Sequence, residues 1–253
     1  MSGPLILDKP IVFEPYSYEG GEILKLPEVQ VGKAQSDFLE VFTQRRSVKQ
    51  LGACPIEALS EVLFLATKPY SIGKDDYGMT VYCSAAPSAG GRHPIDVIVG
   101  LKEQNDRQLY LYQPIGHSLK LLTVAKELQR NFFNDVEQTL SFGESTLLWF
   151  SVQYMRTASK YTDYMSLVWR DVGAQLCCLQ QAAKYVGIDS CPIGYLAEES
   201  FNKMFKSEKL LSGGGLILGK KVIINDINKY YLVDTSDNIE RNEKKQTDNC
   251  ANI

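Results

Sequence analysis

The sequence predicts a single domain of the α+β class. Strand-like and helix-like stretches interleave irregularly along the chain, which suits a sheet and helices that share one core. No internal repeat and no linker divides the body of the chain. With 253 residues, of which 44% are apolar, the chain is long enough to bury a sizeable core.

The first half of the chain is expected to begin with an extended arm over residues 1–35, which mix Pro, Gly and short apolar pieces without periodicity. A first helix is expected to start at Ser36-Asp37, a polar pair typical of helix starts, and a second helix to follow Pro55. Apolar runs rich in β-branched and aromatic residues then predict strands. These strands are expected at residues 79–83, 95–100, 108–113 and 146–152.

Helical spacing is prominent in the second half. A helix is expected to begin near His117 and to run through Ala125. The longest helix is expected from Arg156 to Val186, where Gly187 supplies a stop. The remaining expected elements are a loop at 190–196, a short helix at 198–205 and strands at 216–218 and 230–233.

Beyond Ser236 the chain is polar and charged, with little apolar surface to bury, and is expected to be disordered. The expected organisation is therefore an arm over residues 1–35, one domain over residues 36–235 and a tail over residues 236–253.

Composition excludes several classes of function. The formal net charge of −3 argues against a nucleic-acid-binding protein, which usually carries a basic excess. No run approaches the roughly 18 apolar residues of a membrane span, and the first ten residues lack the pattern of a signal peptide. Six cysteines without a Cys-x-x-Cys pair and only two histidines argue against a zinc site, so no metal is expected. The sequence predicts a soluble, cytoplasmic, reduced protein.

A loop between two predicted strands, Pro87–Pro94, is the first candidate for chemistry. Its adjacent glycines would let backbone amides approach a ligand closely, and Ser88 and Arg92 could hold an anion or the polar edge of a planar ring. The alternative is a Gly-rich hairpin loop.

A basic segment is the second candidate. Arg45, Arg46, Ser47 and Lys49 follow an amphipathic helix and could neutralise a phosphate and hydrogen-bond a ring carbonyl. The alternative is a basic helix end that complements the helix dipole.

The third candidate is Lys160-Tyr161, because a phenol beside an ammonium group can act as a general acid or base. The alternative is an amphipathic helix in which the tyrosine packs inward.

Two Gly-containing segments near the end complete the set. Ser190–Gly194 could lay backbone amides against an aromatic ring or simply turn the chain. Gly214–Lys220 imitates the spacing of a phosphate loop, but Lys221 replaces the Ser or Thr that such loops need and the interior reads as a strand. We reject a nucleoside-triphosphate loop and retain a strand end that presents a cation.

Taken in this order, the motifs resemble those of the flavin-dependent nitroreductase superfamily, and specifically its SagB/McbC-like, azoline-oxidase branch. The resemblance covers residues 36–222, and this chain departs from the branch where Ala174 replaces a histidine. The segments that match are Arg45-x-Ser47-x-Lys49, Pro87–Gly90 with Arg92 and Pro94, Lys160-Tyr161, Asp171–Gly173, Gly187–Gly194 and Gly219-Lys220.

The resemblance implies a nitroreductase-like fold with a central, mixed but mainly antiparallel sheet flanked by helices, and a homodimer that binds FMN between its subunits. It makes Lys160 and Tyr161 the catalytic pair of an FMN-dependent dehydrogenase or oxidase. The residues that it assigns to the cofactor are Arg45, Arg46, Ser47, Lys49, Pro87, Ser88, Ala89, Gly90, Arg92, Pro192, Ile193, Gly194, Lys220 and Lys221.

The expected reaction is dehydrogenation of an azoline-type ring, or a related group, in a peptide, a carrier-bound intermediate or another small molecule. One alternative is a nitro- or quinone reductase driven by NAD(P)H. Another is a non-catalytic scaffold subunit with partners in a biosynthetic complex.

Overall fold

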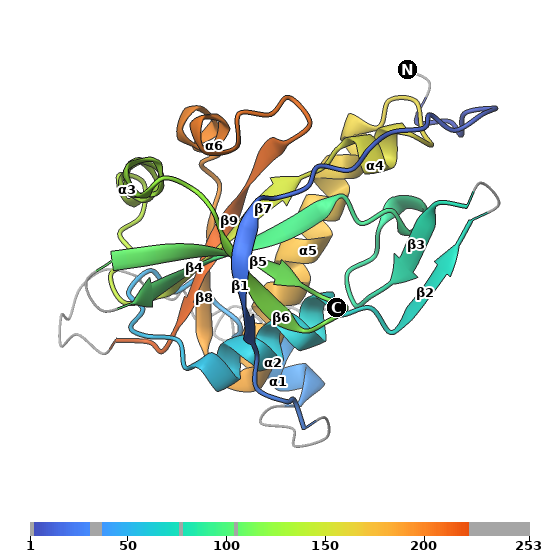
Figure 1. The fold of residues 1–253 in the computed structure, drawn as a ribbon. Helices are drawn as coiled ribbons and strands as arrows, with labels where there is room; N and C mark the ends of the chain where they lie inside the picture. Colours follow the sequence, from blue (N-terminus) through green and yellow to red (C-terminus); the bar gives the residue numbers. More distant parts are fainter. Residues whose placement is uncertain (1–2, 31–36, 76–77, 104–105, 223–253) are drawn as a thin grey trace, which may run out of the picture. The chain divides into compact units, whose positions relative to one another are not determined.

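The computed structural model describes residues 3–30, 37–75, 78–103 and 106–222. A seven-stranded sheet is central, with α2 and α5 packed on one face and α3 and α6 on the other (Figure 1). The predicted α+β class, with a mainly antiparallel sheet flanked by helices, is confirmed. The predicted strand at 230–233 and the tail at 236–253 lie outside the described residues.

The sheet has the strand order β1-β6-β5-β4-β7-β9-β8, and every neighbouring pair is antiparallel. A two-stranded sheet of β2 and β3 lies beside it. The strands are β1 (Gly20–Lys25), β2 (Ser71–Lys74), β3 (Thr80–Cys83), β4 (Ile95–Glu103), β5 (Asp106–Gln113), β6 (Ser118–Leu122), β7 (Thr146–Val152), β8 (Asp189–Ile193) and β9 (Leu211–Gly219).

Helix ends follow local chemistry. The Asp37 side chain accepts a hydrogen bond from the backbone N–H of Glu40 at the start of α1, and Gly187 ends α5 with a φ of 81°. Among the described helices, none is long and apolar enough to cross a membrane. The helices are α1 (Phe38–Gln44), α2 (Ile56–Thr67), α3 (Lys126–Glu137), α4 (Met155–Ala158), α5 (Met165–Val186) and α6 (Glu198–Phe205), with a 3₁₀ turn at Ala89–Gly91.

The core has two halves because alternate residues of a strand point to opposite faces. In β7, Leu148 and Phe150 pack with α2 and α5, whereas Leu147 and Trp149 pack with α3 and α6. All seven residues of β7 are buried. The Trp149 indole N–H donates a hydrogen bond of 2.8 Å to Ser212 Oγ, so this large side chain is buried without an unsatisfied donor.

The prediction of a helix that begins near His117 is wrong. Ser118–Leu122 form β6, which pairs with β5 on one side and with β1 on the other. His117 has a φ of 46° and lies in the turn that joins β5 to β6. The backbone of Ser118–Leu122 forms hydrogen bonds with β1 and β5 instead of helical ones, although the apolar residues have helical spacing.

The predicted helix from Arg156 to Val186 is interrupted. Asp163 has a φ of 46°, and the chain between α4 and α5 pairs with the N-terminal arm instead of continuing the helix. Ile11 N–H donates to the Ser159 carbonyl at 2.8 Å, and Thr162 N–H donates to the Leu5 carbonyl at 2.9 Å. This pairing joins residues more than 140 positions apart, so it cannot be predicted from a local sequence pattern.

Two predicted irregular segments contain strands. The predicted arm includes β1, an edge strand of the large sheet. The predicted loop at 190–196 begins as β8, the other edge strand, in which Pro192 lies opposite Leu216. Proline lacks an N–H, and an edge strand tolerates it because one side of the strand has no neighbour to bond.

Candidate functional site

The Pro87–Gly90 loop contacts the Lys160-Tyr161 pair. Gly90 and Gly91 have φ values of 61° and 65°, in the left-handed region that favours glycine. A Cβ atom on Gly90 would stand 2.6 Å from the Tyr161 hydroxyl oxygen and 3.1 Å from Lys160 Nζ. Only glycine fits at position 90, because any side chain there would collide with Tyr161 and Lys160. Two motifs some 70 positions apart in the sequence therefore form one group.

Asp171 of α5 anchors this loop, a role that the sequence did not reveal. Ser88 Oγ donates to Asp171 Oδ2 at 2.5 Å, and the Ala89 N–H lies 3.3 Å from both carboxylate oxygens. Burial raises the pKa of Asp171, and the bonds from Ser88 and Ala89 oppose that rise. The signal in the sequence was an acidic residue on the buried face of an amphipathic helix.

The Ser88 hydroxyl is already hydrogen-bonded within the protein, since it also accepts a 2.8 Å bond from the His93 N–H. Its visible role is to fix the loop to α5. Any contact of Pro87–Gly90 with a ligand would fall to Ala89, Gly90 and the exposed Pro87 ring.

The N-terminal arm holds the Lys160-Tyr161 segment in place. Leu7 N–H donates to the Lys160 carbonyl at 2.9 Å, and Ile6 forms a β-bridge with Tyr161. Lys160 Nζ lies 5.6 Å from the centroid of the Tyr161 ring. Both side chains are half-buried, so they remain accessible while their backbone is fixed.

A second group gathers the basic segment, β8 and the end of β9. Ser47 forms a parallel bridge with Ser190, and the Val48 N–H donates to the Ser190 carbonyl at 3.0 Å. Gly52 N–H donates to the Lys220 carbonyl at 2.8 Å. A Cβ on Gly219 would collide with the Gly52 carbonyl oxygen, so glycine is required where these segments cross.

Four cations of this group are available to an anion. Within the described part of the chain, Arg45, Lys49, Lys220 and Lys221 form no ion pair. Arg46 differs, because its Nη1 donates to the carbonyls of Thr43 and Arg45 at 2.8 Å each and so closes the end of α1.

Of the residues after Cys191, some are accessible to a ligand and one is not. The Ile193 side chain is buried in the core with α3 and α6, which leaves only its backbone for a ligand. Pro192 is half-buried, and a Cβ on Gly194 would have nothing within 4 Å.

The two groups lie at opposite ends of α5. Asp171, which anchors the first group, is in the second turn of the helix, whereas Gly187 ends the helix just before β8. Sixteen residues of helix separate them, a rise of about 24 Å. One chain therefore presents two separate groups of candidate site residues.

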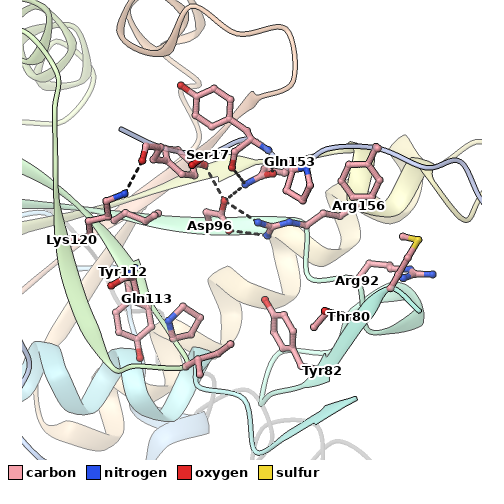
Figure 2. Close-up of a pocket in the computed structure, with 18 of the residues that line it drawn as sticks. Ser17, Thr80, Tyr82, Arg92, Asp96, Tyr112, Gln113, Lys120, Gln153 and Arg156 are labelled. Atoms are coloured by element: carbon pink, nitrogen blue, oxygen red, sulfur yellow. Dashed lines mark hydrogen bonds and ion pairs between the residues drawn. The ribbon is translucent and has the colours of Figure 1, made fainter. Parts of the chain in front are cut away.

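Arg92 and His93 are held by contacts of their own with β3 and the residues next to it. The Arg92 side chain is buried and pairs with Asp75 at 2.5 Å. The His93 ring stacks on Tyr82 with centroids 4.1 Å apart, and its Nε2 bonds the Tyr82 carbonyl at 2.7 Å. Arg92 and Tyr82 face a cavity whose described lining includes none of Pro87–Gly90, Lys160 and Tyr161 (Figure 2).

Both histidines of the chain are expected to weaken the fold in acid. Burial lowers the pKa of His93 and of His117 below the ordinary 6.5. The unfolded chain then binds more protons from 6.5 downwards, so the free energy of unfolding decreases as the pH falls through this window. The slope is at most about 1.4 kcal/mol per pH unit for each histidine.

Urea unfolding between about pH 7.5 and 5.5 measures this effect. The double variant His93→Gln/His117→Gln isolates the histidine contribution, because the carboxylates are unchanged. A wild-type curve that runs parallel to that of the variant over this range would contradict the prediction.

Comparison with known proteins gives a consistent fold. A family model described as the nitroreductase family matches residues 42–220. A candidate nitroreductase from Ralstonia eutropha JMP134 has a TM-score of 0.62 at 18% identity, covering 85% of this chain and 100% of its own. A candidate nitroreductase from Anabaena variabilis ATCC 29413 has a TM-score of 0.57 at 22% identity, covering 83% of this chain.

This chain spans only 41% of the Anabaena protein. A chain of the E. coli microcin synthetase McbBCD complex, with truncated pro-MccB17 bound, has a TM-score of 0.52 at 16% identity and covers 79% of each chain. Among curated proteins, no sequence matches. At these identities the solved structures show a shared fold.

Proposed function

The chain belongs to the nitroreductase family, and we propose that it works as an FMN-dependent oxidoreductase. The observation that carries the proposal is the contact between Gly90 and the Lys160-Tyr161 pair. A group able to take or give a proton thus stands beside a glycine turn that a flat cofactor can approach. Hydride transfer coupled to proton transfer needs both features together.

The residues present fit FMN. Arg45, Lys49, Lys220 and Lys221 would hold the phosphate, with Ser47 toward the ribityl chain, since these cations have no carboxylate partner in the described part of the chain. Ala89, Gly90 and the open backbone at Gly194 would lie along the ring. Bound FMN would supply the hydride acceptor, which no amino-acid side chain can provide.

The proposal requires a homodimer. Because the two groups of candidate site residues lie about 24 Å apart along α5, one FMN would use the basic group of one subunit and the Gly90 group of its partner. The exposed face of α1 supports an interface next to the basic segment, since Phe38, Leu39 and Phe42 are 76%, 68% and 54% exposed.

We propose dehydrogenation of an azoline-type ring or a related group as the reaction. Tyr161 would take the proton that the substrate loses, with the Lys160 ammonium group beside its ring. The arm would keep the pair against Gly90 through its backbone bonds. A chain of the same fold occurs in the microcin synthetase complex with truncated pro-MccB17 bound, which supports a peptide-linked substrate.

An absorption spectrum of the purified protein, followed by identification of the released chromophore, tests the cofactor. We expect flavin bands and FMN. A colourless protein that takes up no added FMN would contradict the proposal and favour a scaffold role. Rapid bleaching of the bound flavin by NADPH, with no loss of two hydrogens from an azoline peptide by mass spectrometry, would favour the reductase alternative.

A further inference from the structure

A cavity of about 850 Å³ lies apart from both groups of candidate site residues. Its volume falls within the range of small-molecule sites. The arm and the chain after β7, which are joined by hydrogen bonds between Tyr16 and Gln153, form one side, and β3 and the turn between β5 and β6 form the other (Figure 2). The residues that the argument uses are Tyr16, Thr80, Tyr82, Arg92, Tyr112 and Lys120.

The floor of the cavity is a closed polar network around Asp96. Arg156 donates to both Asp96 oxygens, at 2.8 Å and 3.2 Å, and Gln153 Nε2 donates to Oδ2 at 2.6 Å. The Tyr18 hydroxyl lies 3.0 Å from Oδ2 and 2.7 Å from Ser151 Oγ. This network neutralises Asp96 and ties the arm to the sheet, so the cavity is built in advance of any ligand.

Within the described ranges, the cavity has an unpaired cation, Lys120, at one end and unmatched donors of Arg92 at the other, where Arg92 Nη2 pairs with Asp75 (Figure 2). Lys120 donates to the Tyr18 carbonyl at 2.8 Å but forms no ion pair among the described residues. Arg92 has 3% of its surface exposed, and its Nε and Nη1 are buried without a hydrogen-bond partner in the described part of the chain. Buried donors of this kind normally have an acceptor, which points to an acceptor supplied from outside.

Aromatic rings supply much of the remaining wall. Tyr16, Tyr82 and Tyr112 line the cavity from three different segments. Flat rings of this kind favour a flat ligand, and the cations favour one that carries an anionic group.

We propose that this cavity binds a small aromatic molecule that carries one anionic group, such as an aromatic carboxylate, at a site separate from the FMN site. The ring lies between the tyrosines, and the anionic group accepts hydrogen bonds from the unmatched Nε and Nη1 of Arg92, with Lys120 adding positive charge at the other end. The site does not depend on the proposed reaction.

Calorimetric titration of the FMN-loaded, full-length protein with 2-naphthoate tests the proposal, with the neutral 2-naphthylmethanol as the matched probe. We expect one 2-naphthoate per chain and at least tenfold weaker binding of the alcohol. Arg92→Gln should weaken 2-naphthoate binding by about 10–100-fold, and Lys120→Gln should weaken it by less. Lys102→Gln, which removes the charge of a lysine paired with Glu144, should leave it unchanged.

Thr80→Trp should weaken binding of both probes, because Thr80 is exposed to the cavity and the indole would take up part of it. If Arg92→Gln fails to fold by circular dichroism, the comparison of 2-naphthoate with 2-naphthylmethanol on the wild-type protein carries the charge test. Failure of 2-naphthoate to bind, equal affinity for the two probes, or undiminished binding to Thr80→Trp would each overturn the proposal.

Discussion

Replacing Tyr161 by phenylalanine is expected to lower turnover by about 10²–10⁴-fold while FMN stays bound, the range typical of a lost general acid or base. The substitution removes only the hydroxyl that faces Gly90. The arm is hydrogen-bonded to the backbone of Lys160 and Thr162, so these bonds persist in the variant. Turnover of FMN-loaded protein, with flavin content measured on the same sample, gives both quantities.

Tyr164→Phe is the matched control. Tyr164 lies three residues further on, and its ring stacks on Tyr154 with centroids 5.8 Å apart. Losing this hydroxyl should leave turnover within about twofold, since the phenylalanine ring keeps the packing of this half-buried side chain. Full turnover of Tyr161→Phe with FMN bound would show that the catalytic assignment is wrong.

The double variant Arg45→Met/Lys220→Met is expected to weaken FMN binding by about 10²–10⁴-fold, because each charge-assisted hydrogen bond to a phosphate contributes about 1.5–3 kcal/mol. Binding of riboflavin, which has the same ring and no phosphate, should change by less than about threefold. Titration of the apoprotein with each flavin, followed by quenching of flavin fluorescence, measures both affinities.

Arg46→Met is the control for charge. It removes a cation from the same segment, but one whose guanidinium bonds two backbone carbonyls. FMN affinity should fall by much less than in the double variant. Equal losses for FMN and riboflavin, or an equal loss in Arg46→Met, would contradict the placement of the phosphate.

Elements with a strong local pattern were predicted well. β7 is a continuous run of residues buried on both faces of a sheet, and such a run is recognised in the sequence without knowledge of the strands beside it. The stop of α5 at Gly187 was equally readable, because a left-handed C-cap favours glycine. Ser118–Leu122 was misassigned because its alternation is short and its partners, β1 and β5, lie elsewhere in the chain.

In the candidate site, too, local motifs were predictable from the sequence and long-range contacts were not. The motifs around Arg45, Gly90, Tyr161 and Lys220 were visible in the sequence, because glycine, proline and charged residues at fixed spacing are local features. The anchoring of the loop by Asp171 was not visible, since it joins Ser88 to a residue 83 positions away.

By itself, the sequence determined the class of the fold, the strands and helices with strong periodicity, and the presence of a glycine loop, a lysine–tyrosine pair and a basic segment. Only the tertiary structure decided which of these meet. It brought Gly90 against Tyr161, set the basic segment at the other end of α5, and placed Arg92 on a separate cavity. The physical reason is that propensity and periodicity act over a few residues, whereas contacts between distant segments depend on how whole elements pack.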